Sequence, residues 1–473
     1  MAQVLNTLQT FFYSKVGFFF CLLAILFISL FIKIQNAQDA VAFADYDEYY
    51  TVQVAYGTFE DALPNDSVAN IWKNASVDNG NNVLYNFILI LWVNLMGKTE
   101  WMIRVLSLIF HLGSIFLSIK ILSKFGTPKT YVLLAVVALS FHPTLHQFSI
   151  ITRAYSLLMF EAILLFYLCY AIEKKSIKTH LFTTFTILAL VLTHYLAVPF
   201  VFAIFIDKIL TAKKRSLVSI DSIPFWVAAF LVCVYFSMNL DWFISIAGKN
   251  DAIQQTAEME DSTRHLSVFS FFDRFFGFVS AWFCSVGYLG KLANGVFSEM
   301  GRFLLNLAAV LFLALILIKT KTKKNFMVLF GIGLVFPVTT VLMSQHLTGF
   351  GLKYSIAFIA LYLILFFKES NKNSLYLRLL SAFMLINILI NITAQQAMHI
   401  RPTFEVFISG EKKSFTQSQT PLLRDFIAQQ NQRFGFVPYQ SEQELCFLKT
   451  LMIDFTLDYK LEQAGVVSAP NLK

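Results

Sequence analysis

Acidic side chains gather in the first long polar stretch of the chain, residues 35–82, against the single cation Lys73. Asp45 and Glu48 precede apolar positions at helical spacing, so we expect Asp45 to cap a helix and Glu48 to reach back to its first turn. Asp47 would then occupy the second helical position, where the helix dipole stabilises an ionised carboxylate. An ionised carboxylate suits general-base chemistry. A solvated acidic loop remains the other interpretation.

Other polar groups stand where apolar stretches begin or break. Arg153 with Tyr155, and Lys353 with Tyr354, each open an apolar stretch. Such cations either bind a phosphate or extend to the membrane interface as anchors. The trio 193–195, which contains His194 and Tyr195, interrupts an apolar run, where a polar group can line a cavity.

Asp78 lies among turn-forming residues before Leu84 and Tyr85. It is either part of a simple loop or part of a polar rim that faces Asp47.

Metal binding has only weak support. His142 and His146 are four residues apart, which would suit a metal on one helix face, but Pro143 separates them and no third ligand is near in sequence. Four of the five cysteines lie in apolar segments and the fifth stands alone in the tail, so no disulfide framework or cysteine metal site is expected.

The elements that must position these residues are membrane helices. The chain has 473 residues, 57% hydrophobic and 14% charged, with a mean hydropathy of +0.64. Soluble domains carry about 25% charged residues, so the composition predicts an all-α polytopic membrane protein. The net charge of +8 is spread over short clusters after apolar runs. This is the positive-inside pattern rather than a nucleic-acid surface.

Apolar stretches of about 17 residues or more are candidate spans. The first, Val16–Ile34, exceeds a signal-peptide core, and we interpret it as an uncleaved helix. Val83–Met96 is too short to span and should lie along or re-enter the membrane. About eleven spans are predicted; the others are Trp101–Leu122, Tyr131–Phe148, Tyr155–Ile172, Leu181–Leu210 divided in two at 193–195, Ile223–Met238, Phe303–Ile318, Phe326–Met343, Tyr354–Phe367 and Leu375–Ile392.

Lys/Arg clusters occupy alternate connections, which predicts that these connections are cytoplasmic. The acidic loop 35–82, His194 and Lys353 then share the opposite, outer face. Phe271–Leu289 is a half-buried helix or a twelfth span, which would reverse the side of everything after it. We expect one transmembrane domain over residues 1–400 and a small folded, non-cytoplasmic appendage over 401–473.

Several motifs together resemble the C-type membrane glycosyltransferases, closest to the bacterial branch related to protein O-mannosyltransferases and the lipid A aminoarabinose transferase. Two departures stand out: Asn81-Asn82-Val83 replaces a proline-containing motif, and no acidic residue immediately precedes Arg153. The matching motifs are Asp47-Glu48, Asp78 with Leu84-Tyr85, Leu95-Met96-Gly97, Glu100, Arg104-Val105-Leu106-Ser107, Arg153-Ala154-Tyr155-Ser156, Thr193-His194-Tyr195 and Lys353-Tyr354.

The resemblance implies an inverting transfer of a sugar from a polyprenyl-phosphate donor to an acceptor hydroxyl of a lipid, glycan or protein. The active site would face outward from a bacterial inner membrane. Asp47 and Glu48 would be catalytic, and the rim would comprise Asp78, His194 and Tyr195. The donor phosphate would be bound by Arg153, Tyr155, Lys353 and Tyr354. No cofactor is certain, although a divalent cation could share the phosphate charge.

Two other classes of function remain. A transporter or lipid flippase also uses intramembrane polar residues and broken helices, but it predicts repeats and mid-helix charges, which we do not identify in the sequence. A non-catalytic scaffold is the third class, and the acidic loop argues against it only weakly.

Overall fold

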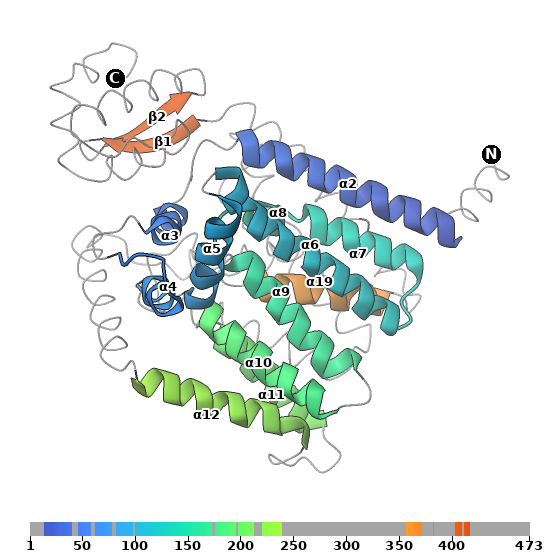
Figure 1. The fold of residues 1–473 in the computed structure, drawn as a ribbon. Helices are drawn as coiled ribbons and strands as arrows, with labels where there is room; N and C mark the ends of the chain where they lie inside the picture. Colours follow the sequence, from blue (N-terminus) through green and yellow to red (C-terminus); the bar gives the residue numbers. More distant parts are fainter. Residues whose placement is uncertain are drawn as a thin grey trace, which may run out of the picture.

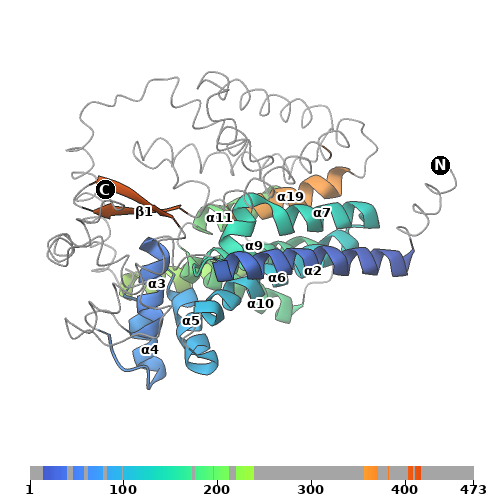
Figure 2. The same cartoon turned by 90° about the horizontal axis from the view of Figure 1, so that it is seen from above.

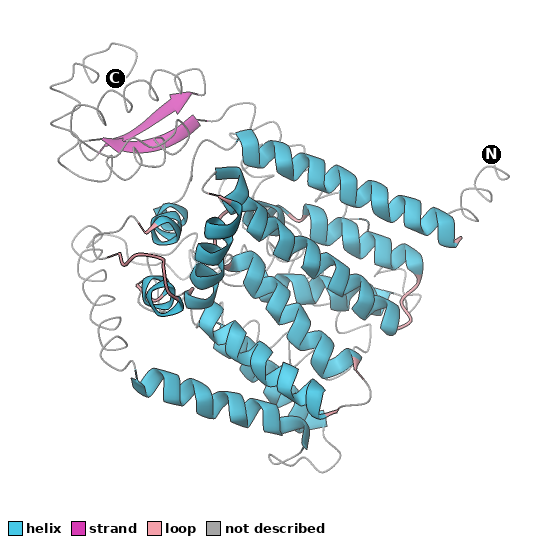
Figure 3. Cartoon of the chain, in the orientation of Figure 1, coloured by secondary structure: helices cyan, strands magenta, loops and turns pink. Residues whose placement is uncertain are grey.

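The computed structural model describes residues 14–39, 46–57, 62–77, 82–97, 100–172, 176–194, 197–211, 220–238, 356–370, 382, 403–408 and 411–416. Almost all of these residues are helical (Figure 3). The long helices lie side by side as a bundle, and three short helices gather at one end of it (Figures 1 and 2).

The bundle contains helices from both ends of the described chain. Helix α6 packs on α9, α2 packs on α7, and α19 packs on both α7 and α9. The elements are α2 (Lys15–Asp39), α6 (Glu100–Lys124), α7 (Lys129–Phe141), α8 (Pro143–Ser149), α9 (Tyr155–Phe166) with the π-helical continuation η1 (Tyr167–Ala171), α10 (Ile177–Thr193), α11 (Val198–Thr211), the 3₁₀ turn η3 (Ile220–Ser222), α12 (Ile223–Met238) and α19 (Ile356–Ser370).

Local sequence explains where several helices start and stop. Ser176 caps α10 in a capping box with Thr179. Helix α6 ends before Gly126, whose φ of +68° suits the left-handed position that follows a helix. Pro128 follows and prevents continuation, because proline lacks the N–H that an interior helical position donates.

The three short helices form the end of the bundle that carries the acidic loop. They are α3 (Tyr46–Tyr56), α4 (Val68–Ala75) and α5 (Val83–Met96). Ser67 caps α4 by accepting the backbone N–H of Asn70 at 3.2 Å. A small apolar cluster, comprising Val54, Ile71, Ala75, Val83 and Ile90, joins all three.

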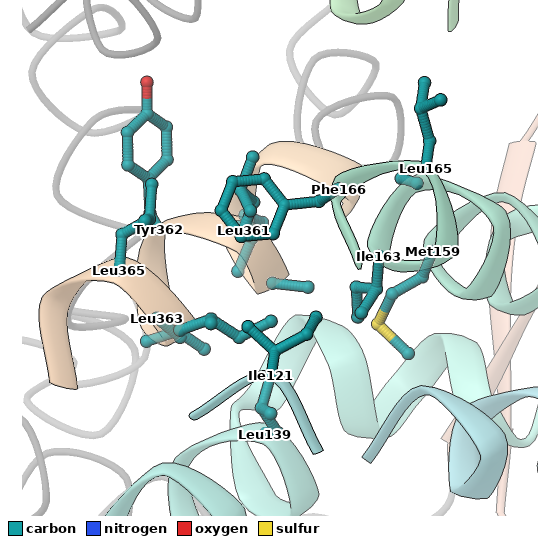
Figure 4. Close-up of a cluster of buried hydrophobic side chains, with 14 of the residues drawn as sticks. Ile121, Leu139, Met159, Ile163, Leu165, Phe166, Leu361, Tyr362, Leu363 and Leu365 are labelled. Carbon is teal, nitrogen blue, oxygen red and sulfur yellow. The ribbon is translucent and has the colours of Figure 1, made fainter. Parts of the chain in front are cut away.

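The main core lies between α6, α7, α9 and α19. Figure 4 shows Ile121, Leu139, Ile163 and Leu363 converging from these four helices. Because α19 comes from far along the chain, this core ties the N-terminal helices to the later part of the protein. Burial of apolar area contributes about 25 cal/mol per Å², so this contact is a major source of stability within the bundle.

Several predicted boundaries are confirmed. Val83–Met96 and Ile223–Met238 are helices with the predicted limits, and the long stretch 181–210 is divided after Thr193. The predicted single helix Tyr131–Phe148 is wrong. It breaks into α7 and α8 at His142, whose extended backbone precedes Pro143, because a residue before proline is disfavoured in the helical region. Predicted helices at 271–289, 303–318 and 326–343 lie outside the described residues, as does 375–392 except for residue 382.

The C-terminal tail contains a β-hairpin. Strands β1 (Thr403–Ile408) and β2 (Glu411–Thr416) pair antiparallel, with Thr403 opposite Thr416. The all-α expectation therefore holds for described residues up to 370 and is wrong for the tail, where β-branched and aromatic residues favour strands. The division at residue 400 remains a prediction.

Lysines gather at the bundle end opposite to α3, α4 and α5. Lys129 lies over the Phe18 ring near the start of α2, and Lys368 lies over Phe125 after α6. Lys120 and Lys208 lie over Tyr167 and Tyr170 of η1. The described lysines of alternate connections therefore share one end of the bundle, as the charge pattern predicts.

Two described helices, Lys15–Ile34 and Trp101–Lys124, are long and apolar enough to cross a membrane by length and composition. Shorter apolar helices surround them, among them Tyr155–Ala171 and Ile177–Thr193. Exposed phenylalanines along α2 include Phe19, Phe20, Phe27 and Phe31. Such a surface fits lipid better than water, since large contiguous apolar patches are rare on soluble monomers.

Candidate functional site

Helix α3 presents the acidic pair. It begins at Tyr46, so Asp47 occupies the second helical position and Glu48 the third, as expected. Asp47 and Thr51 are four residues apart and lie on the same face of α3, one turn from each other. A contact that holds Thr51 in place therefore also fixes the backbone position of Asp47.

Arg153 holds that face of α3. Its Nη1 donates to Oγ1 of Thr51 at 2.8 Å, and the side chain is only 6% exposed. Arg153 is thus buried within the protein, whereas a snorkelling arginine places its charged head at a solvated interface. The guanidinium instead joins the segment before α9 to the helix of Asp47.

Aromatic rings line the same end of the bundle. Tyr155 lies beneath Arg153, with 5.9 Å between the guanidinium carbon and the ring centroid. The Tyr155 ring stacks on His194 at 6.2 Å and meets Phe148 edge-on at 4.7 Å. The structure thus brings together Arg153, Tyr155 and His194, three predicted site residues from two separate connections.

The break between α10 and α11 places His194. Its backbone is extended, which ends α10, and its carbonyl accepts the N–H of Ala197 at 2.8 Å. The residue is 1% exposed, so it is an interior group. Its ring contacts Tyr155, and the expectation that the break lines a site stays a prediction.

Glu161 is a charged residue that sequence reasoning missed. It lies in the middle of α9, is 4% exposed, and its Oε1 accepts from Oγ1 of Thr193 at 3.1 Å. The statement that mid-helix charges are lacking is therefore wrong. A lone glutamate in an apolar helix was a visible signal, since ionisable residues in such helices are commonly functional.

Helix α5 packs beside α3 and makes polar contacts with its other neighbours. Tyr85 lies 3.0 Å from Oγ of Ser107 on α6, and Asn86 donates to the carbonyl of Ala75 at 3.2 Å. Asn82, just before α5, has φ +62° and ψ +19°, a conformation that asparagine tolerates and proline cannot adopt. The departure from the proline-containing motif thus matches a different backbone at the start of α5.

The histidine pair does not share one helix face. His142 lies at the break and His146 lies inside α8, where its Nδ1 is 3.1 Å from Nζ of Lys33. Among the described side chains, no group of three His, Cys, Asp or Glu residues could hold a metal ion. Lys33 is a second buried charge that sequence reasoning missed.

The remaining predicted site residues are placed only in part or not at all. Asp47 and Glu48 are located by the backbone of α3. The residues Asp78, Tyr195, Lys353 and Tyr354 lie outside the described part of the chain. The polar end of the bundle therefore defines a candidate site with a carboxylate helix, a buried arginine and two stacked rings.

The composition and the apolar helices are consistent with a membrane protein, whose candidate site lies at one end of the helical bundle. Residues 81–242 match the family described as dolichyl-phosphate-mannose-protein mannosyltransferase. The predicted resemblance to C-type membrane glycosyltransferases is thereby confirmed for that range, which contains Arg153, Tyr155 and His194. No curated protein matches the chain in sequence.

Among solved structures, the chain is similar to the crystal structure of the Archaeoglobus fulgidus oligosaccharyltransferase in complex with Zn and sulfate. The sequence identity is 13% and the TM-score 0.41. The alignment covers 89% of this chain and 57% of that one, so this chain spans little more than half its length.

Proposed function

We propose that this protein is an inverting glycosyltransferase that moves a sugar from a polyprenyl-phosphate donor to an acceptor hydroxyl on the outer face of a bacterial inner membrane. The observation that carries the proposal is the bond from Arg153 to Thr51. It joins the range that matches the mannosyltransferase family to α3, which carries Asp47 and Glu48 in its first turn.

The bonds and protons of the proposed transfer balance with the carboxylate of Asp47 and the phosphate leaving group. Asp47 accepts the proton of the acceptor hydroxyl, whose oxygen attacks the anomeric carbon from the side opposite the leaving group. The bond between the anomeric carbon and the phosphate oxygen breaks, and polyprenyl phosphate leaves with the electron pair. That leaving group is a weak base, so it needs compensation of its charge more than a proton.

Arg153 and Lys353 supply that compensation, with Tyr155 and Tyr354 beside them, because fixed cations in a site of low dielectric stabilise developing charge strongly. Asp78, His194 and Tyr195 form the rim that receives the sugar and the acceptor. The stacked pair of Tyr155 and His194 is buried next to the arginine and supports its position. Glu48 orients the acceptor or holds a divalent cation if one takes part.

Sugar transfer by purified protein tests the proposal. Asp47→Asn keeps the size of the side chain but accepts no proton, so transfer should fall by about 10²- to 10⁴-fold. Asp45→Asn is the matched control, because asparagine caps a helix about as well as aspartate, and activity should stay within a few-fold. Near-parent transfer by Asp47→Asn would exclude it as the base.

A transporter or lipid flippase is the second candidate, and buried Glu161 is the observation that favours it. The glutamate is bonded to Thr193, next to His194, which equally fits support of a transfer site. The same assay separates the two functions. Movement of a labelled lipid between leaflets without any transfer of sugar would establish transport.

A further inference from the structure

A buried lysine occupies a seam between α2, α6 and α8. Lys33 is fully buried, and its Nζ donates to Oγ of Ser149 at 2.8 Å and lies 3.1 Å from Nδ1 of His146. His111 of α6 is also fully buried and lies close enough to interact electrostatically with Lys33 and His146. Residues more than a hundred positions apart in the chain thus meet at one amine.

Burial of the Lys33 amine in this seam costs free energy, which a functional or structural role of the lysine would explain. No carboxylate among the described side chains pairs with Lys33, and in an apolar bundle each buried polar group needs a hydrogen-bond partner. An apolar residue would pack at this position without that cost. The N–H donors of Lys33 can hold α8 in place, because its two partners among the described side chains, His146 and Ser149, both lie on α8.

Helix α8 leads directly to the site. Ser149, bonded to Lys33, is its last residue, and its Oγ also donates to the carbonyl of His146 at 2.6 Å. The next four residues reach Arg153, whose N–H donates to the carbonyl of Ile151 at 2.9 Å in a tight turn. Such a short, hydrogen-bonded segment leaves Arg153 little freedom relative to Ser149.

Arg153 in turn holds Thr51, one turn along α3 from Asp47. A continuous chain of contacts therefore runs from Lys33 on α2 through the end of α8 to Arg153 and then to α3. Among the described side chains, the hydrogen bonds of Lys33 go to His146 and Ser149 of α8 and not to α3. Its influence on Asp47 must pass through α8 and Arg153.

We propose that Lys33 is a positioning residue for the candidate site: by anchoring the end of α8 to α2, it sets Arg153 and so fixes α3, the helix that presents Asp47. This inference rests on the proposed function for its catalytic consequence. Its structural part, the control of α3 from α2, stands independently of the reaction.

Hydrogen exchange and sugar transfer of three variants test it. Lys33→Met removes the donors, Thr51→Val removes the acceptor of Arg153, and the third variant combines both. A misplacement of about 1 Å can cost about 10²-fold in rate, so Lys33→Met should lower transfer by about 10- to 100-fold. It should also speed amide exchange in Tyr46–Tyr56, a helix that neither described hydrogen bond of Lys33 reaches.

Sugar transfer by the double variant decides whether Lys33 acts through Arg153 and Thr51. If Lys33 acts through Arg153 and Thr51, the double variant transfers sugar no more slowly than the worse single variant, because residues on one chain of contacts are not additive. Losses that multiply, or unchanged exchange in α3 of Lys33→Met, would overturn the proposal. If the parent protein transfers no sugar, that result counts against the proposed function alone. Amide exchange in α3 still tests whether Lys33 controls the position of α3.

Ser29→Ala is the matched control, since Ser29 is fully buried one turn before Lys33 on α2 and its hydroxyl lacks a hydrogen-bond partner in the described structure. It should leave exchange in α3 unchanged. If Lys33→Met does not fold, Ser149→Ala removes one of the two contacts and should speed exchange in α3 to a smaller degree. Unchanged exchange in Ser149→Ala would then contradict the proposal.

Discussion

At the scale of single residues, the polar groups of this bundle are distinguished by their partners. Arg153 and Thr51 bond across 102 positions of sequence, and Thr193 and Glu161 bond across 32. Hydrogen bonds to charged groups contribute about 1.5–3 kcal/mol, so each such link is a substantial local constraint. Both links join a residue of the candidate site to a neighbouring helix.

Glu161 and Thr193 allow a matched pair of substitutions. Thr193→Val keeps the shape of the side chain but leaves Oε1 of Glu161 buried without its donor. A buried group left unsatisfied costs about 1–3 kcal/mol, so the protein should unfold at a lower temperature. Glu161→Gln keeps an acceptor for Thr193 and removes the ionisable group, so stability should change by less than about 1 kcal/mol.

The measurement is thermal unfolding of the detergent-solubilised variants beside the parent. Equal unfolding temperatures for Thr193→Val and the parent would show that the bond contributes nothing. A large loss in Glu161→Gln would show that the ionised carboxylate itself is needed. That result would strengthen the transport alternative, in which an ionised group in a helix is functional.

At the scale of elements, helices α6 and α9 approach each other at a glycine. A Cβ on Gly113 would lie 3.1 Å from Cε2 and 3.2 Å from Cδ2 of Phe160. Alanine at this position gains about 1 kcal/mol of helix propensity and loses some of it to this contact. Leucine adds three more carbon atoms against the same ring.

Gly113→Leu should therefore destabilise the protein by about 1–3 kcal/mol, the usual cost of overpacking. Combining it with Phe160→Ala should recover part of that loss, because the smaller side chain frees the space that leucine needs. Thermal unfolding of the single and double variants measures both effects. If Gly113→Leu loses no stability, or the double variant recovers none, then α6 and α9 do not approach each other closely at Gly113.

The sequence predicted the elements well where one short-range signal dominates. The limits of α5 and α12 follow from apolar stretches with polar flanks, and α3 begins at Tyr46, directly after the residue predicted to cap it. Pro143 indicates a helix break, but the length of the apolar stretch favoured one continuous helix, and that prediction was wrong. The β-hairpin of the tail was missed because its strands are short and mix polar with apolar residues.

The site was predicted as a set of residues but not as a set of contacts. Arg153, Tyr155 and His194 were selected because they stand at helix ends, and the structure brings them together. The bonds to Thr51 and from Lys33 depend on how helices pack over a hundred positions of sequence, which no local pattern encodes. Glu161 and Lys33 were missed for a different reason: each is a single ionisable residue within an otherwise apolar helix, a visible signal that the apolar pattern outweighed.

At the scale of the whole molecule, charge is sorted between the two ends of the bundle. Lys120, Lys129, Lys208 and Lys368 mark one end through contacts with aromatic rings. The acidic pair of α3 and the bond from Arg153 mark the other. In a membrane this asymmetry sets orientation, because lysine and arginine are retained in the cytoplasm.

Single cysteines in a cysteine-free background should report that orientation in intact cells. Ser76→Cys lies just after α4 at the acidic end, and Lys124→Cys is the last residue of α6 at the basic end. A membrane-impermeant thiol reagent should label the first from outside and the second only after permeabilisation. Ser418→Cys in the tail should behave like Ser76→Cys if the appendage is non-cytoplasmic. Labelling of Ser76 and Lys124 from the same side would contradict the sorting of charge, whereas cytoplasmic labelling of Ser418 alone would show an additional span, for which 271–289 is the candidate.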